Sequence, residues 1–106
     1  MYETNEKITL PTRGYFCKGD SGNSILIIST FLALNFIGYE YKTKVKIDKM
    51  MGDYFGSNLE TWVKLFQKNN ELKVDGCIGK LTLNKMKEYG LIIWRWLYAS
   101  WSKINC

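Results

Sequence analysis

One short phrase occurs twice in this chain, and it limits the possible folds more than any other feature. The later copy, 74–82, reads Val-Asp-Gly-Cys-Ile-Gly-Lys-Leu-Thr, and the earlier copy, 52–60, reads Gly-Asp-Tyr-Phe-Gly-Ser-Asn-Leu-Glu. Asp and Gly favour a tight turn, because Asp can bond its own backbone and Gly tolerates a positive φ. A helical pattern follows each copy, so the sequence predicts two units in which a turn leads into a helix.

The first residues of these two helices are suited to capping. Ser57 and Glu60 have the spacing of a capping box, in which each side chain bonds the other residue's backbone N–H. Thr82 falls in the first turn of the later helix, where its hydroxyl can reach a free N–H. We expect Gly79 to allow a close approach of the backbone at that helix start.

Three segments have the apolar spacing of helices. The first, 25–37, is apolar on nearly every face, which predicts a central helix that is covered on two sides. The segments 58–69 and 80–89 place apolar residues on one face, and Gly90 suits the end of the last helix. Lysines alternate with apolar residues in 40–51, which predicts an extended loop or a short strand. The expected inward-facing residues of the later two helices are Leu59, Trp62, Val63, Phe66, Leu83, Met86 and Tyr89.

The order of these elements resembles the peptidoglycan-binding domain of bacterial cell-wall hydrolases and phage endolysins. That family's pattern leads from Gly-Asp-x-Gly into a first helix, and then through Gly-Tyr to Asp-Gly-x-Phe-Gly and a second helix. The second helix ends in Phe-Gln, and Asp-Gly-x-x-Gly-x-x-Thr opens the third. The matching residues here span roughly 10–88 and are Gly19, Asp20, Gly22, Gly38, Tyr39, Gly52, Asp53, Phe55, Gly56, Phe66, Gln67, Asp75, Gly76, Ile78, Gly79 and Thr82.

The sequence departs from the family pattern mainly in its first half. The first Asp-Gly pair is split, because three residues, 49–51, stand between Asp48 and Gly52. Ile28-Ser29 replaces the usual Leu-Gln of the first helix. Glu71, in the loop after the second helix, stands where the family commonly has Gly.

Five aromatic or amide side chains are candidates to line a groove between the first and second helices. Aromatic faces stack on sugar rings, and amides bond acetamido groups and peptide stems. One of the five, a Trp, also lies on the apolar face of its helix, where a large aromatic residue is usually part of the core. Turn chemistry accounts for the Asp, Gly and Thr residues of the two repeated phrases without any ligand. The five candidates are Tyr39, Tyr54, Trp62, Gln67 and Asn69, with Tyr54 as the better exposed one.

The composition excludes several kinds of catalytic and metal site. The chain of 106 residues has no His, which removes His-based triads and His-containing zinc sites. Cys17, Cys77 and Cys106 are an odd number without a Cys-x-x-Cys pair, which indicates neither a disulfide framework nor a zinc site. At least one thiol is then free or paired between chains, and synthesis in a reducing cytoplasm is the simplest interpretation.

The acidic residues do not offer a pair for glycoside hydrolysis, which needs two carboxylates across one cleft. Asp53 and Asp75 belong to the turns, and Glu60 to the predicted capping box. We therefore expect no catalysis, no cofactor and no metal ion. The net charge of +5 favours anionic partners such as a cell wall, but the lysines are scattered, so no specific nucleic-acid site is expected.

The length suits one folded domain with additional terminal segments. We expect 1–9 to be a tail or linker, 10–90 to be the domain, and 91–106 to be an aromatic extension, which we expect to be helical. Covering the outer face of the first helix is the favoured role of this extension. A homodimer seam and a membrane surface are the other two interpretations. On one helical stripe the extension carries Trp94, Leu97, Tyr98 and Trp101.

Together these patterns predict an all-α, three-helix domain of two pseudo-repeats. The resemblance implies binding to peptidoglycan as the targeting module of an endolysin or related hydrolase, with the hydrolase on a longer parent chain or a partner. The first residues, 1–6, do not resemble a signal peptide, so we expect synthesis in the cytoplasm. The resemblance to phage endolysins implies release to the wall through holin pores. The alternative is a small interaction or oligomerisation protein that binds a protein or a membrane through the extension.

Overall fold

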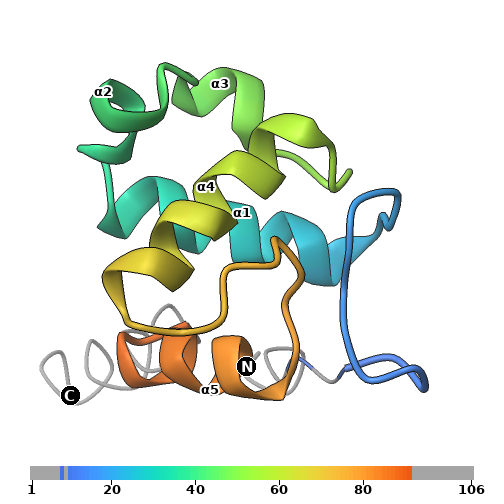
Figure 1. The fold of residues 1–106 in the computed structure, drawn as a ribbon. Coiled ribbons are helices and arrows are strands. Elements are labelled where there is room, and N and C mark those ends of the chain that lie inside the picture. The colour runs from blue at the N-terminus through green and yellow to red at the C-terminus, as the bar shows by residue number, and fades with distance from the viewer. Residues whose placement is uncertain (1–7, 9, 92–106) are drawn as a thin grey trace, which may run out of the picture.

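The computed structural model describes residue 8 and residues 10–91, and in this part of the chain all the regular elements are helices. Figure 1 shows the yellow-green α4 crossing in front of α1, with α2 and α3 on one side of this pair and α5 on the other. The predicted all-α fold is confirmed. The helices are α1 (Asn23–Asn35), α2 (Tyr39–Thr43), α3 (Ile47–Met50), α4 (Ser57–Asn69) and α5 (Lys80–Glu88).

The core lies where the three longer helices meet. The predicted inward face of α4 is confirmed, because Leu59, Trp62, Val63 and Phe66 are all buried. Leu83 and Met86 of α5 are buried as well. The last predicted core residue, Tyr89, is instead 47% exposed, although its ring packs edge-on against the rings of Phe36 and Phe66.

The segment 40–51 forms α2 and α3, so the predicted extended loop is wrong there. The carboxylate of Glu40 in α2 accepts a hydrogen bond of 2.8 Å from the backbone N–H of Ile47, where α3 begins. The indole N–H of Trp62 donates to the carbonyl oxygen of Val45 between the two helices, at 3.0 Å. These bonds join residues that are 7 and 17 positions apart, and the alternation of lysines with apolar residues gives no sign of them.

The face of α1 that points away from the core is only partly covered. Ile25, Ile28 and Leu32 are fully buried, whereas Leu34 is 74% exposed. The predicted cover, the aromatic stripe of the extension, lies outside the described residues. Within residues 8 and 10–91, no helix is both long and apolar enough to cross a membrane.

The core also includes one residue on each side of the segment 10–90. Ile8 is 3% exposed and Leu91 is 1% exposed. The backbone N–H of Leu91 donates to the carbonyl oxygen of Met86 at 3.0 Å, after Gly90 has turned the chain with a φ of 95°. This is the helix end that the sequence predicts at Gly90.

Residues 14–22, here named the N-terminal loop, pair with both repeated turns. Turn 1 is defined as residues 52–56 and turn 2 as residues 75–79. The loop forms one antiparallel bridge with each turn. Figure 1 shows this blue loop at one edge of the molecule, beside the segments that lead into α4 and α5. The bridged pairs are Ser21 with Tyr54 and Phe16 with Ile78.

Glycines, and not the predicted polar side chains, precede the helices that follow the turns. Gly56 precedes α4 and Gly79 precedes α5, and neither helix has a side-chain capping bond. The predicted capping box of Ser57 and Glu60 is therefore wrong. The physical reason is that α4 already begins at Ser57, so this residue is helical and does not stand at the cap position.

Candidate functional site

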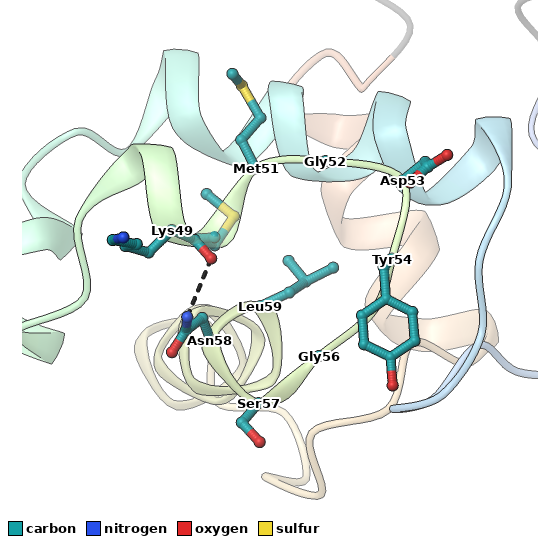
Figure 2. Close-up of a pocket in the computed structure, with 10 residues that line it drawn as sticks. Lys49, Met51, Gly52, Asp53, Tyr54, Gly56, Ser57, Asn58 and Leu59 are labelled. Atoms are coloured by element: carbon teal, nitrogen blue, oxygen red, sulfur yellow. Dashed lines mark hydrogen bonds between the residues drawn. The ribbon is translucent and has the colours of Figure 1, made fainter.

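A pocket of about 360 Å³ opens beside turn 1 (Figure 2). Three consecutive elements build it: the end of α3, turn 1 itself and the first residues of α4. Its floor is apolar, because Met50 and Leu59 are buried. The lining residues are Lys49, Met50, Met51, Gly52, Asp53, Tyr54, Gly56, Ser57, Asn58 and Leu59.

Tyr54 forms an aromatic wall of this pocket, and Gly56 makes its position possible. The side chain of Tyr54 is 57% exposed. A Cβ added at Gly56 would lie 3.2 Å from the Cε2 atom of the ring and 3.3 Å from Cδ2. The φ of Gly56 is −103°, which any residue adopts. Glycine at position 56 is therefore explained by the tyrosine ring beside it, and not by the backbone.

Polar groups of several kinds stand at the rim of the pocket. The side-chain amide of Asn58 donates to the carbonyl oxygen of Lys49 at 3.0 Å, which ties the start of α4 to the end of α3. Asp53 and Ser57 are also exposed. An exposed ring above an apolar floor, with amide, hydroxyl and charged groups at the rim, suits a ligand that has both an apolar face and hydrogen-bonding groups.

Of the five predicted ligand residues, only Tyr54 lines this pocket. Tyr39 and Trp62 are buried, with ring centroids 5.5 Å apart. Asn69 donates to the hydroxyl oxygen of Tyr39 at 3.3 Å. Burial raises the pKa of the Tyr39 hydroxyl, and the bond from Asn69 opposes this effect. These three residues form a contact between α2 and α4, and the burial of Trp62 agrees with its core interpretation.

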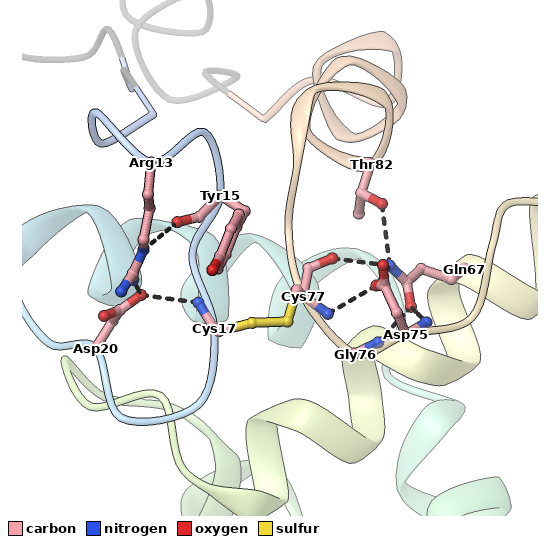
Figure 3. Close-up of a disulfide and its surroundings, with 9 residues drawn as sticks. All are labelled: Arg13, Tyr15, Cys17, Asp20, Gln67, Asp75, Gly76, Cys77 and Thr82. Atoms are coloured by element: carbon pink, nitrogen blue, oxygen red, sulfur yellow. Dashed lines mark hydrogen bonds and ion pairs between the residues drawn. A yellow bond between two sulfur atoms is a disulfide. The ribbon is translucent and has the colours of Figure 1, made fainter.

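Gln67, the fifth candidate, extends from α4 against turn 2 and forms hydrogen bonds with it (Figure 3). Its side chain is 1% exposed. Its amide oxygen accepts hydrogen bonds from the N–H groups of Asp75 at 3.1 Å and Gly76 at 2.9 Å. Its amide nitrogen donates to the Asp75 carboxylate, the Cys77 carbonyl and the Thr82 hydroxyl at 2.9–3.1 Å. Thr82 therefore bonds Gln67, and the prediction that its hydroxyl reaches a free backbone N–H is wrong.

Asp75 closes turn 2 through its side chain. One carboxylate oxygen accepts a hydrogen bond of 2.9 Å from the N–H of Cys77 and another from the amide of Gln67. Desolvation raises the pKa of the Asp75 carboxyl, but the bonds from Cys77 and Gln67 outweigh it, so the pKa lies below its ordinary value. Asp75 is thus a turn residue, as the sequence predicts.

The tight contact expected at Gly79 occurs at Gly76 instead, and a side chain rather than the backbone makes it. Gly76 has a φ of 78°, and an added Cβ would lie 2.9 Å from Cγ of Glu60. A Cβ at Gly79 would meet its nearest atom, the carbonyl oxygen of Gly14, at an ordinary contact distance of 3.8 Å. The prediction for Gly79 is therefore wrong, because the Glu60 side chain covers the first part of the turn rather than the helix start.

Cys17 and Cys77 form a disulfide between the N-terminal loop and turn 2 (Figure 3). Their Cα atoms are 4.5 Å apart, although the residues are separated by 60 positions in the sequence. The prediction that the cysteines form no disulfide framework is wrong for this pair. The bridge between Phe16 and Ile78, each next in sequence to one of the cysteines, brings the two together.

The other end of the N-terminal loop is held by Asp20. Its carboxylate accepts a hydrogen bond of 2.8 Å from the N–H of Cys17 and pairs with the guanidinium of Arg13. The bond from Cys17 and then that from Arg13 hold the pKa of the Asp20 carboxyl below its ordinary value. Arg13 also stacks over the ring of Tyr15, 5.0 Å from its centroid. In the described residues no group of three or more Cys, Asp or Glu side chains could hold a metal ion.

A family model described as "Putative peptidoglycan binding domain" matches residues 32–86, just over half of the 106 residues. The chain belongs to the peptidoglycan-binding domain family. No curated protein and no solved structure was found to match it. As a member of that family, the chain is a peptidoglycan-binding domain, and such a domain acts at the cell wall. The matched segment contains the pocket and both turns, whereas the N-terminal loop lies outside it.

Sequence reasoning missed the residues that surround Tyr54 in the pocket. Lys49 and Met51 are among them, and both belong to the insertion that splits the first Asp-Gly pair. Ser57 and Asn58 complete the rim from α4. The insertion was visible as a departure from the family pattern, but only the fold shows that it forms one wall of a pocket.

Proposed function

We propose that this domain binds peptidoglycan without catalysis, and that it does so at the pocket beside turn 1. Family membership supports the ligand. The single observation that supports the location is Tyr54, an exposed ring over a pocket of about 360 Å³. A saccharide ring stacks on this aromatic face, while the amide of Asn58 and the hydroxyl of Ser57 bond its acetamido and hydroxyl groups.

The domain serves as the targeting module of an endolysin or related wall hydrolase in this proposal. The hydrolase resides on a longer parent chain or on a partner, and the protein reaches the wall through phage-type holin pores to contribute to bacteriolysis. Three of the acidic residues support a non-catalytic role because their carboxylates bond the domain's own backbone. Asp75 bonds Cys77, Asp20 bonds Cys17, and Glu40 bonds Ile47.

A protein partner or a second copy of the chain is the second candidate function. Exposed apolar side chains near the end of α1 and in α2 favour it: Leu34 is 74%, Ile37 61% and Tyr41 78% exposed. The predicted dimer seam of Trp94, Leu97, Tyr98 and Trp101 lies outside the described residues. Size-exclusion chromatography with light scattering tests it, and a monomeric chain would contradict the homodimer.

Co-sedimentation with peptidoglycan sacculi stripped of teichoic acid tests the main proposal. The intact chain is expected to sediment with them, and Tyr54→Ala to weaken binding about tenfold or more, because an exposed aromatic anchor is lost. The thermal midpoint of this variant should stay unchanged. Tyr41→Ala is the matched control, because Tyr41 is also an exposed tyrosine but does not line the pocket.

Three outcomes of that experiment would contradict the proposal. A chain that stays in the supernatant at low salt does not bind peptidoglycan. A chain that binds only when teichoic acid is present responds to charge and not to the glycan. If Tyr54→Ala binds as well as Tyr41→Ala, the binding site is not the pocket beside turn 1.

A further inference from the structure

We infer that the Cys17–Cys77 disulfide is a redox clasp: the bond opens in reducing surroundings and closes in oxidising ones. Through the N-terminal loop, the clasp controls the pocket beside turn 1. The control of wall binding rests on the function proposed above. The behaviour of the clasp itself rests only on the contacts of the loop.

The fold holds the two cysteines ready to react. Phe16 and Ile78 exchange two backbone hydrogen bonds, of 3.0 Å and 2.8 Å, directly beside them. The N–H of Cys17 is bonded to Asp20, and the N–H of Cys77 to Asp75. These bonds do not involve the sulfur atoms, so they bring the two thiols together in the reduced chain as well. Both cysteines are partly exposed, which leaves them open to small thiols and disulfides.

The same loop continues from the clasp to the pocket. The N–H of Gly19 donates to the carbonyl oxygen of Phe55, and the N–H of Phe55 donates to the carbonyl oxygen of Asp20, both at 2.8 Å. The N–H of Gly22 donates to the carbonyl oxygen of Asp53 at 2.8 Å. Phe55 and Asp53 flank Tyr54 in turn 1. A loop that is tied at Cys17 therefore also fixes the backbone that presents this tyrosine.

Closing the clasp is a two-electron oxidation, and a low-molecular-weight disulfide is the oxidant. The thiolate of one cysteine attacks this disulfide, forms a mixed disulfide and releases one small thiol. The second cysteine, as its thiolate, then displaces the other small thiol and forms the Cys17–Cys77 bond. The protein loses two electrons and two protons, and the small disulfide becomes two thiols. The cytoplasm opposes this reaction, whereas surroundings outside the cell membrane favour it. A domain made in the cytoplasm thus acquires its fixed pocket only at the wall.

The test uses the full chain with Cys106→Ser, so that only this pair can react. It is prepared in a reduced state with a dithiol and in an oxidised state with a small disulfide, and the thiols are counted by alkylation and mass. The oxidised state is expected to have a thermal midpoint higher by on the order of 10–20 °C. The amide protons of Gly22 and Phe55 should exchange about tenfold faster in the reduced state. Sedimentation of the reduced state with sacculi should be about fivefold weaker than that of the oxidised state, because a smaller fraction of the reduced protein is competent to bind.

The double variant Cys17→Ser, Cys77→Ser provides the control, since it should behave as the reduced state under both conditions. Equal midpoints and equal exchange in the two redox states would overturn the inference. The inference would also be overturned if the reduced state had a lower thermal midpoint but the same amide exchange and the same binding as the oxidised state. The disulfide would then stabilise the fold without any influence on turn 1. If exchange depends on redox state but the oxidised chain does not sediment, the clasp is supported and peptidoglycan binding is refuted.

Discussion

Turn 1 and turn 2 have related sequences and each leads into a helix, but a preceding helix holds them in different ways. Gln67 of α4 reaches turn 2 with a long side chain and makes five hydrogen bonds there. Ser29 occupies the corresponding place in α1. Its hydroxyl contacts only one residue of turn 1, the N–H and the carbonyl of Gly52, at 3.0 Å and 2.9 Å.

The third residue of each turn shows what this difference achieves. In turn 2 that residue is Cys77, which is bonded to the N-terminal loop through its sulfur. In turn 1 it is Tyr54, whose ring is exposed at the pocket. The two copies of one motif have therefore diverged: turn 2 anchors the fold, and turn 1 presents a surface. Four changes, taken from the largest expected effect on stability to the smallest, test this division.

Replacing Gln67 should destabilise the domain most. Gln67→Ala leaves the N–H groups of Asp75 and Gly76 without their partner in a buried site, so we expect a loss of about 3–5 kcal/mol in the free energy of unfolding. Denaturant unfolding measures this loss. Lys68→Ala, at an exposed position of the same helix, should change the value by less than about 0.5 kcal/mol. A loss for Gln67→Ala that is smaller than that for Ser29→Ala would reverse the proposed ranking of the turns.

Gly76→Ala should follow, with a loss of about 1–3 kcal/mol, because its φ is positive and its Cβ would meet Glu60. Gly79→Ala is the matched control within the same turn. Its φ of −94° is open to alanine and its Cβ has room, so a change within about 0.5 kcal/mol is expected. Thermal unfolding of both variants distinguishes the positions. Equal losses would show that the turn does not discriminate between its glycines.

Ser29→Ala should cost less, about 1–2 kcal/mol, because one small hydroxyl is removed and the N–H and carbonyl of Gly52 lose their partner. Ser24→Ala in the same helix serves as the control and should change the free energy of unfolding by less than about 0.5 kcal/mol. The same denaturant experiment applies. A neutral Ser29→Ala would mean that the N-terminal loop alone holds turn 1.

Acid should produce the smallest and most gradual effect. The pKa values of Asp20 and Asp75 lie below their ordinary values in the folded chain. The stability that they contribute is therefore present above about pH 4, the unfolded value, and is lost as the pH falls through the folded pKa values. The thermal midpoint should therefore fall as the pH drops below about 4. Asp20→Asn with Asp75→Asn should have a lower midpoint near neutral pH but a shallower decline, and a decline as steep as that of the parent would refute the assignment.

The helices that bury a single apolar face, α4 and α5, were predictable from the sequence. The spacing of Leu59, Trp62 and Phe66 fixes the inward face of α4, and the spacing of Leu83 and Met86 fixes that of α5. Helices α2 and α3 were not predictable in this way, because four or five residues make too few turns for a period to appear. They depend instead on contacts such as that between Trp62 and Val45.

The candidate site was predictable only in part, for a related reason. Tyr54 stood out as an exposed aromatic residue within a turn phrase. The wall formed by Lys49 and Met51 arises because the insertion packs beside α4. Such tertiary packing cannot be read from the local sequence. The partnership of Cys17 with Cys77 likewise has no local spacing, since it depends on a loop that pairs with a turn 60 positions later.

The pairing of the N-terminal loop has a consequence for the order in which the domain can fold during synthesis. The loop leaves the ribosome before its partners, Asp53, Phe55 and Ile78, have been made. A nascent chain that ends after α4 has the turn 1 partners but lacks Ile78 and Cys77, so the start of its loop has nothing to pair with. The two pseudo-repeats are therefore not two independent folding units. The first half depends on the second because the second supplies Ile78 and Cys77, the partners of the N-terminal loop. A fragment that ends after α4 therefore lacks these contacts.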